Sequence, residues 1–228
     1  MELWHVLNHS IEGRDLFLDS QDYARFVHNL YEFNDVVPAG NAYRLFNPSK
    51  MMDIVSPSFS GKERELLVEI HGWVLMKDHY HLILSELVEG GVSLFLRKVN
   101  VGYSKYINER YERKGTLFRG RTKKVLIEEQ SHFLYILHYF HLNPLDYLQG
   151  AKEWRVRSKS SIKSFREALE YLDSYRWSSY LDYIGKKNFP SILTTSLFNE
   201  ALGDYRDSIS EYLRDTEYDE SITELVLE

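Results

Sequence analysis

The sequence predicts an α+β fold, in which helices cover one face of an antiparallel sheet in the split βαβ arrangement. Two observations lead to this class. Short segments with strand character alternate with longer helical segments, in the order strand, helix, strand, strand, helix, strand, helix. Only Lys77 and Asp78 separate the second strand from the third. So short a connection predicts a hairpin, and therefore an antiparallel pair.

The first strand and the first helix are expected near the N-terminus. The run Leu3–Asn8 has strand character, and the side chains of Asp19 and Asp22 suit the start of a helix that continues to about Phe33. Residues 34–62 hold three of the five prolines of the chain. We therefore expect a long surface loop or insertion there.

The remaining elements of this first unit follow from periodicity and from helix-breaking residues. Gly90 and Gly91 precede a long helical segment, and Pro144 ends the last one. We expect strands at 68–76, 79–85 and 121–128, and helices at 92–112 and 129–142.

Beyond residue 150 the sequence predicts a helical extension. We assign 1–150 to one domain and 151–228 to the extension, with helices at about 159–174 and 195–214. The last thirty residues, 199–228, carry ten acidic side chains against two arginines, which makes an acidic tail.

Composition excludes several classes of protein. The 228 residues include no cysteine, so disulfides and thiolate metal sites are excluded, and a metal would need His, carboxylate or amide ligands. No apolar stretch approaches the roughly 18 residues of a membrane span. The N-terminus lacks the features of a signal peptide, and we expect a cytoplasmic protein without membrane contact.

A basic stripe lies within this chain of net charge −6. Residues 97–124 hold ten Lys or Arg against two Glu, with tyrosines between them. Such a pattern suits a phosphate backbone with bases stacked nearby. A solvated helix face has the same composition, so both interpretations stay open.

His79 and His81 are the most informative pair in the sequence. Side chains alternate along a strand, so both imidazoles point to the same face, with Cα atoms roughly 6–7 Å apart. Both could hold one metal ion, although an isolated pair of this kind is more often structural. A metal site therefore needs a third ligand. The histidines at 5, 9, 28, 71 and 132 are expected at the surface or satisfied in the core.

Tyr139 and Asn143 could supply the missing groups, with Tyr135, Tyr103, Tyr106 and Tyr111 as competing tyrosines. Tyr139 and Asn143 are four residues apart in the helix before Pro144 and therefore share a face. An amide oxygen would complete a metal site, and a phenol beside it suits nucleophilic attack on a phosphodiester. His138 and His141 are competing ligands, which would form a four-histidine hydrolase site with His79 and His81.

Four motifs, in this order, resemble those of the single-tyrosine HUH transposases, in particular the REP-associated tyrosine transposases and their insertion-sequence relatives. The motifs are Met76-Lys-Asp-His79-Tyr-His81, Tyr103-Ser-Lys-Tyr106-Ile-Asn108 with Gly115-Thr-Leu-Phe118-Arg-Gly-Arg121, Tyr139-Phe-His-Leu-Asn143-Pro144, and Trp177-Ser-Ser-Tyr180. They span about 1–185. The chain departs from the family pattern at Lys77-Asp78, where the family has Pro-Asn, and at Asn8-His9-Ser10, where it often has Asn-Arg-Gly.

The resemblance implies a ferredoxin-like HUH endonuclease fold in 1–150. It also implies metal-dependent nicking and strand transfer of single-stranded DNA through a 5′-phosphotyrosine, as in the transposition of insertion or REP-type elements. His79, His81 and Asn143 would bind Mg or Mn, and Tyr139 would be the catalytic nucleophile. The partner would be single-stranded or hairpin DNA, and we expect a monomer, with a dimer as the alternative.

Nine cations of the basic stripe are the predicted DNA contacts. They are Arg97, Lys98, Lys105, Arg113, Lys114, Arg119, Arg121, Lys123 and Lys124. Two other functions stay open at this point. One is a domesticated, non-catalytic binder of structured DNA or RNA, and the other is a metal phosphodiesterase that forms no tyrosine linkage.

Overall fold

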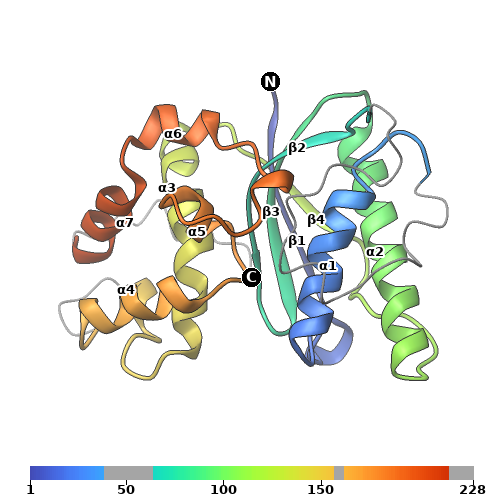
Figure 1. The fold of residues 1–228 in the computed structure, drawn as a ribbon, viewed down its shortest axis with the longest axis horizontal. Coiled ribbons are helices and arrows are strands. Elements are labelled where there is room, and N and C mark those ends of the chain that lie inside the picture. Colours follow the sequence, from blue (N-terminus) through green and yellow to red (C-terminus); the bar gives the residue numbers. More distant parts are fainter. Residues whose placement is uncertain (39–63, 157–161, 216–228) are drawn as a thin grey trace.

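The computed structural model describes residues 1–38, 64–156 and 162–215. In this part of the chain an antiparallel sheet with the strand order β2-β3-β1-β4 lies between two groups of helices (Figure 1). Its strands are β1 (Leu3–His9), β2 (Val68–Leu75), β3 (His79–Glu86) and β4 (Lys123–Leu126). This is the predicted split βαβ order, and the predicted fold class is confirmed.

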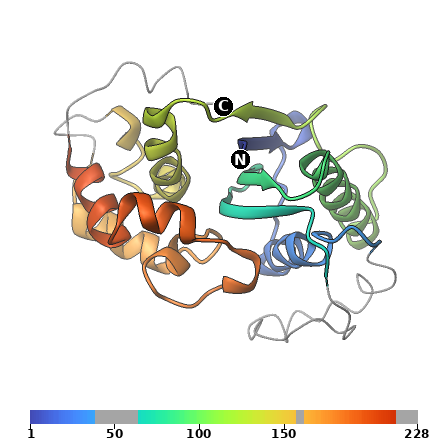
Figure 2. The ribbon, with the colours of Figure 1, turned by 90° about the horizontal axis from the view of Figure 1, so that it is seen from above.

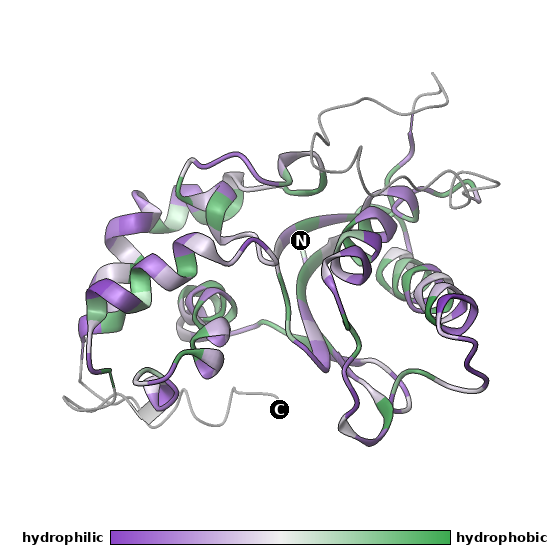
Figure 3. Ribbon diagram, turned by 60° about the horizontal axis from the view of Figure 1, so that its bottom comes forward, coloured by the Kyte–Doolittle hydropathy of each residue, from purple (hydrophilic) through white to green (hydrophobic). Residues whose placement is uncertain are grey.

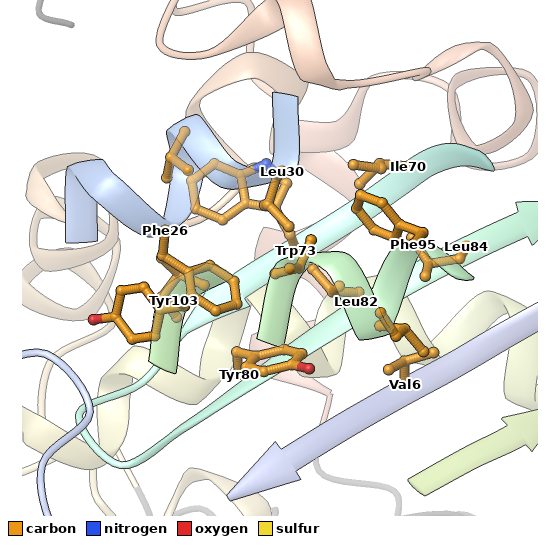
Figure 4. Packing of buried hydrophobic residues seen from close by; sticks show 14 of the residues in the cluster. Val6, Phe26, Leu30, Ile70, Trp73, Tyr80, Leu82, Leu84, Phe95 and Tyr103 are labelled. Atoms are coloured by element: carbon orange, nitrogen blue, oxygen red, sulfur yellow. The ribbon is translucent and has the colours of Figure 1, made fainter. Parts of the chain in front are cut away.

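Helices α1 (Ser20–Glu32) and α2 (Gly91–Arg110) cover the first face of the sheet. Asp19 caps α1, because its side chain accepts hydrogen bonds from the backbone N–H groups of Gln21 and Asp22. Aromatic and aliphatic side chains from both helices and the strands fill the core between them (Figure 4). This cluster includes Val6, Phe26, Leu30, Ile70, Trp73, Tyr80, Leu82, Leu84, Phe95 and Tyr103.

The second face of the sheet is also covered. Leu3, Val74 and Ile83 point to this face and pack with α3 (Gln130–Leu142) and the C-terminal helices in a second hydrophobic cluster. Those helices are α4 (Phe165–Ser174), α5 (Tyr180–Tyr183), α6 (Ser196–Leu202) and α7 (Tyr205–Arg214). Figure 2 shows the strands between the two helix groups, and Figure 3 shows hydrophobic positions along the strands and along helices of both groups. The extension is therefore part of one packed structure with the sheet.

A segment of the extension protects the open edge of β2. The backbone N–H of Leu75 donates to the carbonyl of Trp177, and that of Ser179 donates to the carbonyl of Trp73, both at 2.9 Å. The Trp177 ring stacks on Tyr23 of α1 with 4.9 Å between ring centroids. The Trp177-Ser-Ser-Tyr180 motif thus has a structural role, since an unpaired edge strand invites aggregation.

Several boundaries differ from those expected. The expected helix at 159–174 lies outside the described residues up to 161, and its described part contains α4 from Phe165, with the Ser164 side chain as the cap. The expected helix at 195–214 is divided into α6 and α7, because Gly203 between them has a φ of +63°. Short 3-10 helices occupy Ile11–Gly13, Asn143–Tyr147, Trp154–Val156 and Pro190–Ile192.

Some sequence predictions are not tested by the structure. From residue 39 the expected insertion lies outside the described residues, and so does the acidic tail from residue 216. The boundary at residue 150 stays a prediction. In the described ranges no helix is both long enough and apolar enough to cross a membrane.

Candidate functional site

A group of three potential metal ligands lies where β1 ends and β3 begins. The antiparallel register places His9 directly opposite His79, and their ring centroids are 4.7 Å apart. The Nδ1 atom of His79 lies 2.8 Å from a carboxylate oxygen of Asp78. Each of the three residues offers one donor atom, and these atoms all lie within 4.8 Å of one another. The set is chemically able to hold a metal ion.

The charge states of His9 and Asp78 favour metal binding. Burial, followed by the neighbouring His79, lowers the pKa of His9. The hydrogen bond with His79 lowers the pKa of Asp78, although partial burial opposes that shift. Metals bind neutral imidazole and ionised carboxylate, and both shifts favour those forms.

His81 lies on the same face of β3 as His79, as predicted, with 5.0 Å between ring centroids. It is fully buried, and burial holds its pKa well below the ordinary value. Its Nδ1 lies 3.0 Å from Nε2 of His5, which reaches it from β1. Its Nε2 is buried and has no hydrogen-bond partner among the described residues. One nitrogen of this neutral imidazole is therefore available as a ligand.

Helix α3 brings the predicted nucleophile beside this pair. The Tyr139 ring meets the His81 ring edge-on, with 5.7 Å between centroids, and only 1% of Tyr139 is exposed. Asn143 is fully buried at the end of α3. The structure therefore brings Tyr139 beside His81 and His79 on the second face of the sheet, and Asn143 follows at the end of the same helix.

Arg155 also lies at the candidate site, although the sequence did not predict it there. From the 3-10 helix Trp154–Val156 its guanidinium donates to the amide oxygen of Asn143 and pairs with Asp146. The same guanidinium lies 5.5 Å from the centroid of the Tyr139 ring. The amide oxygen predicted to bind a metal is thus already bonded to a cationic side chain.

The four-histidine alternative is wrong. The ring nitrogens of His138 bond to the carbonyl of Leu134 and to Ser208, each at 3.0 Å. Those of His141 bond to the hydroxyls of Tyr205 and Ser179, at 2.6 and 2.7 Å. Neither side chain has a ring nitrogen left for a metal, because both hold the C-terminal helices against α3.

Most of the residues predicted to contact DNA line two adjoining hollows. A groove of about 890 Å³ runs between α2 and the loop before β4, and Arg97, Lys105, Arg121 and Lys124 line it. A second hollow of about 480 Å³ contains His9 and Asp78 together with Arg119, Arg121 and Lys123. Because Asn8 and Arg121 line both, the hollows connect the basic stripe with the candidate metal ligands.

The other three predicted contacts line neither of these hollows. The Lys98 ammonium donates to the backbone carbonyls of Asp35, Val36 and Val37 after α1. Arg113 and Lys114 follow the end of α2. The structure therefore divides the nine residues into six at the hollows and three elsewhere.

His5, His9 and Asp78 were not predicted as members of the candidate site. The sequence predicted surface or satisfied core positions for His5 and His9, and a turn position for Asp78. The available signal was topology, because a split βαβ order places β1 beside β3. No signal in the sequence indicated Arg155.

A solved structure of a REP-associated tyrosine transposase bound to a REP hairpin has a similar fold. The TM-score is 0.50, the sequence identity is 12%, and the match covers 85% of each chain. No family model matches the sequence, and no curated protein matches it. The likeness to the transposase thus concerns the arrangement of the chain in space.

Proposed function

We propose that this protein nicks single-stranded DNA and transfers the strand through a covalent bond to Tyr139, with a divalent cation as cofactor. The observation that carries the proposal is the contact of Tyr139 with His81, next to His79, on the second face of the sheet. The similar fold of a transposase solved with hairpin DNA, over 85% of both chains, supports it.

The chemistry follows from a phenol beside imidazoles. The Tyr139 oxygen forms a bond to phosphorus while the bond from phosphorus to the 3′ oxygen breaks. The phenol loses its proton, and the leaving 3′ oxygen gains one. A bound cation would stabilise the negative charge that develops on the phosphate oxygens. Because the 5′-phosphotyrosine keeps the bond energy, another 3′ hydroxyl can reverse the step and join a new strand.

The ligand set predicted from the resemblance is His79, His81 and Asn143. The buried, unpartnered Nε2 of His81 suits a ligand. The amide oxygen of Asn143 would first have to leave Arg155. Mg or Mn remains the expected ion, because phosphate oxygens suit Mg and imidazoles suit Mn.

The DNA is proposed to follow the two hollows. Arg97, Lys105 and Lys124 along the groove of α2 would bind the backbone, and Arg121 would lead it to the second hollow. This path ends at His9 and Asp78, beside His79. We expect a single-stranded or hairpin substrate on this path, as the resemblance implies. A monomer stays our prediction.

A second candidate function is non-catalytic binding of structured DNA or RNA. The observation that favours it is the burial of Tyr139, which is 1% exposed and lies next to the Arg155 guanidinium. A nucleophile in this position needs a local opening before a phosphodiester can reach it.

The products formed from labelled hairpin DNA distinguish these functions. Labelled single-stranded hairpin DNA is incubated with the full chain, with and without Mn²⁺, and resolved under denaturing conditions. Strand transfer predicts a Mn²⁺-dependent protein–DNA adduct. Binding without any cleavage would support the non-catalytic function. Free 5′-phosphate product without an adduct would indicate a metal phosphodiesterase.

A further inference from the structure

We propose that His9 and Asp78 hold the divalent cation together with His79, and that Asn143 is not a ligand. The family resemblance implies a different ligand set, in which His81 and Asn143 take the places of His9 and Asp78. The inference adds the ligands of the cation to the proposed function. It rests on that function for the role of the cation in DNA cleavage.

The backbone fixes the three side chains in place. His9 is the last residue of β1, Asp78 lies in the hairpin turn, and His79 is the first residue of β3. The carbonyl of Asp78 accepts from the N–H of Ser10 at 2.7 Å, and the carbonyl of His79 accepts from the N–H of Met76 at 2.8 Å. The turn is thus tied to both neighbouring strands, so the ligands are held close together before a cation binds.

The donor set suits a small divalent cation. The three donor atoms lie within 4.8 Å of one another, and a Mg²⁺ ion about 2.0–2.1 Å from each ligand would place opposite ligands roughly 4 Å apart. The Nε2 atom of His9 is buried and has no hydrogen-bond partner among the described residues. A bound cation would give this nitrogen a partner, which a core histidine would ordinarily find in the protein.

Asn143 is a poor ligand in this arrangement. Its amide oxygen accepts from the Arg155 guanidinium, which also pairs with Asp146. A metal ion bound to the amide oxygen of Asn143 would have to displace the Arg155 guanidinium and would then lie next to that positive charge. His9 and Asp78 offer a nitrogen donor and a negatively charged carboxylate, which attracts a cation despite Arg119 and Lys123 in the same hollow.

The hollow around His9 and Asp78 explains how a phosphate would reach the cation. Arg119, Arg121 and Lys123 line the same hollow of about 480 Å³. Three protein ligands leave coordination positions open on Mg²⁺ or Mn²⁺, and a phosphodiester oxygen is a hard ligand that fits such a position. The structure therefore combines a cation site with cationic side chains that bind the rest of the phosphate group.

Binding of Mn²⁺ alone to the full chain tests the inference. Calorimetric titration would compare wild type with His9→Gln, Asp78→Asn and Asn143→Ala. His138→Gln is the matched histidine control, because both of its ring nitrogens bond elsewhere. We expect His9→Gln and Asp78→Asn each to lose at least about 10-fold in affinity. Asn143→Ala and His138→Gln should stay within about twofold of wild type, as expected of residues outside the site.

The inference is overturned if wild type does not bind Mn²⁺, if either His9→Gln or Asp78→Asn binds like wild type, or if Asn143→Ala loses as much affinity. A second measurement needs no variant. In the ¹⁵N-labelled wild-type chain, Zn²⁺ should shift the ring nitrogens of His9 and His79 and leave those of His138 in place. An unchanged His9 signal would also overturn the inference.

No DNA enters these titrations, so their outcome is separate from that of the cleavage reaction. Binding that follows His9 and Asp78 without any Tyr139 adduct would leave this inference standing and reject the proposed function. An adduct with metal binding independent of His9 would do the reverse.

Discussion

The Arg155 guanidinium donates a hydrogen bond to the amide oxygen of Asn143 and lies 5.5 Å from the centroid of the Tyr139 ring. The Arg155 side chain thus contacts both Tyr139, which lies in α3, and Asn143, which is the C-terminal cap of that helix. This hydrogen bond occupies the amide oxygen of Asn143. In the proposed reaction the same positive charge would lie near the Tyr139 ring, whose oxygen attacks the phosphate.

Arg155→Gln should slow adduct formation by about 10²-fold, because it removes a positive charge next to the developing phosphate charge. Its affinity for Mn²⁺ should stay within about twofold of wild type, because Arg155 lies outside the proposed ligand set. Single-turnover kinetics with labelled DNA measure the first effect, and calorimetry measures the second. An unchanged rate of adduct formation would show that Arg155 only positions Asn143.

Arg121→Ala should weaken binding of single-stranded hairpin DNA, because Arg121 lines both hollows. The slope of log affinity against log salt concentration should fall by about 0.7 for each lost phosphate contact. Lys98→Ala is the matched control, since the Lys98 ammonium bonds to backbone carbonyls away from the groove. Fluorescence anisotropy at several salt concentrations measures both. Equal losses for the two variants would contradict the proposed DNA path.

Asp22→Ala should lower the free energy of unfolding by about 3 kcal/mol, because it breaks a buried charge network. The Asp22 carboxylate is fully buried and accepts from the hydroxyls of Tyr106 and Tyr111 at 3.0 and 2.8 Å, and it also pairs with Arg110. Urea unfolding provides the measurement.

The exposed ion pair of Glu12 with Arg14 offers a control for that experiment. Glu12→Gln should change the free energy of unfolding by less than about 1 kcal/mol, as exposed ion pairs do. A loss for Asp22→Ala no larger than that of Glu12→Gln would show that the network does not join α1 to α2.

His28 should make the stability depend on pH. Burial, with the charge of Arg25, lowers its pKa to about 4, whereas an unfolded histidine has a pKa of about 6.5. On acidification the unfolded chain therefore takes up the proton first. The His28 contribution is complete above about pH 6.5 and is lost as the pH falls towards 4.

The matching variant is His28→Gln, which does not titrate. Between pH 7.5 and pH 5.5 wild type should lose about 1.4 kcal/mol more unfolding free energy than the variant. Urea unfolding at both pH values measures the difference. The same pH dependence in both proteins would mean that His28 is solvated in the folded state.

Much of the fold could be predicted from local patterns. The two-residue turn at Lys77 and Asp78 defined the β2–β3 hairpin, and the helix-breaking Pro144 marked the end of α3. The cover on the second face was not predicted, because it depends on contacts between α3 and helices far along the chain. His141 is an example: it bonds to Tyr205, 64 residues later.

The site was predictable only where its residues are close in sequence. The spacing of His79 to His81, and of Tyr139 to Asn143, placed each pair on one face. The approach of His9 to His79 depends on the strand register, since a shift of one residue would turn His9 to the other face. The contact of Arg155 with Asn143 depends on the path of an irregular segment, which no periodicity encodes.

The central claim is that Tyr139 is the nucleophile, and its most direct test is the denaturation-resistant protein–DNA adduct formed with Mn²⁺ and labelled hairpin DNA. Tyr135 is the matched control, because it precedes Tyr139 by one turn of α3 and its ring lies 5.6 Å away. The account predicts the adduct with wild type and with Tyr135→Phe, and none with Tyr139→Phe. An equal yield of adduct from Tyr139→Phe would contradict it.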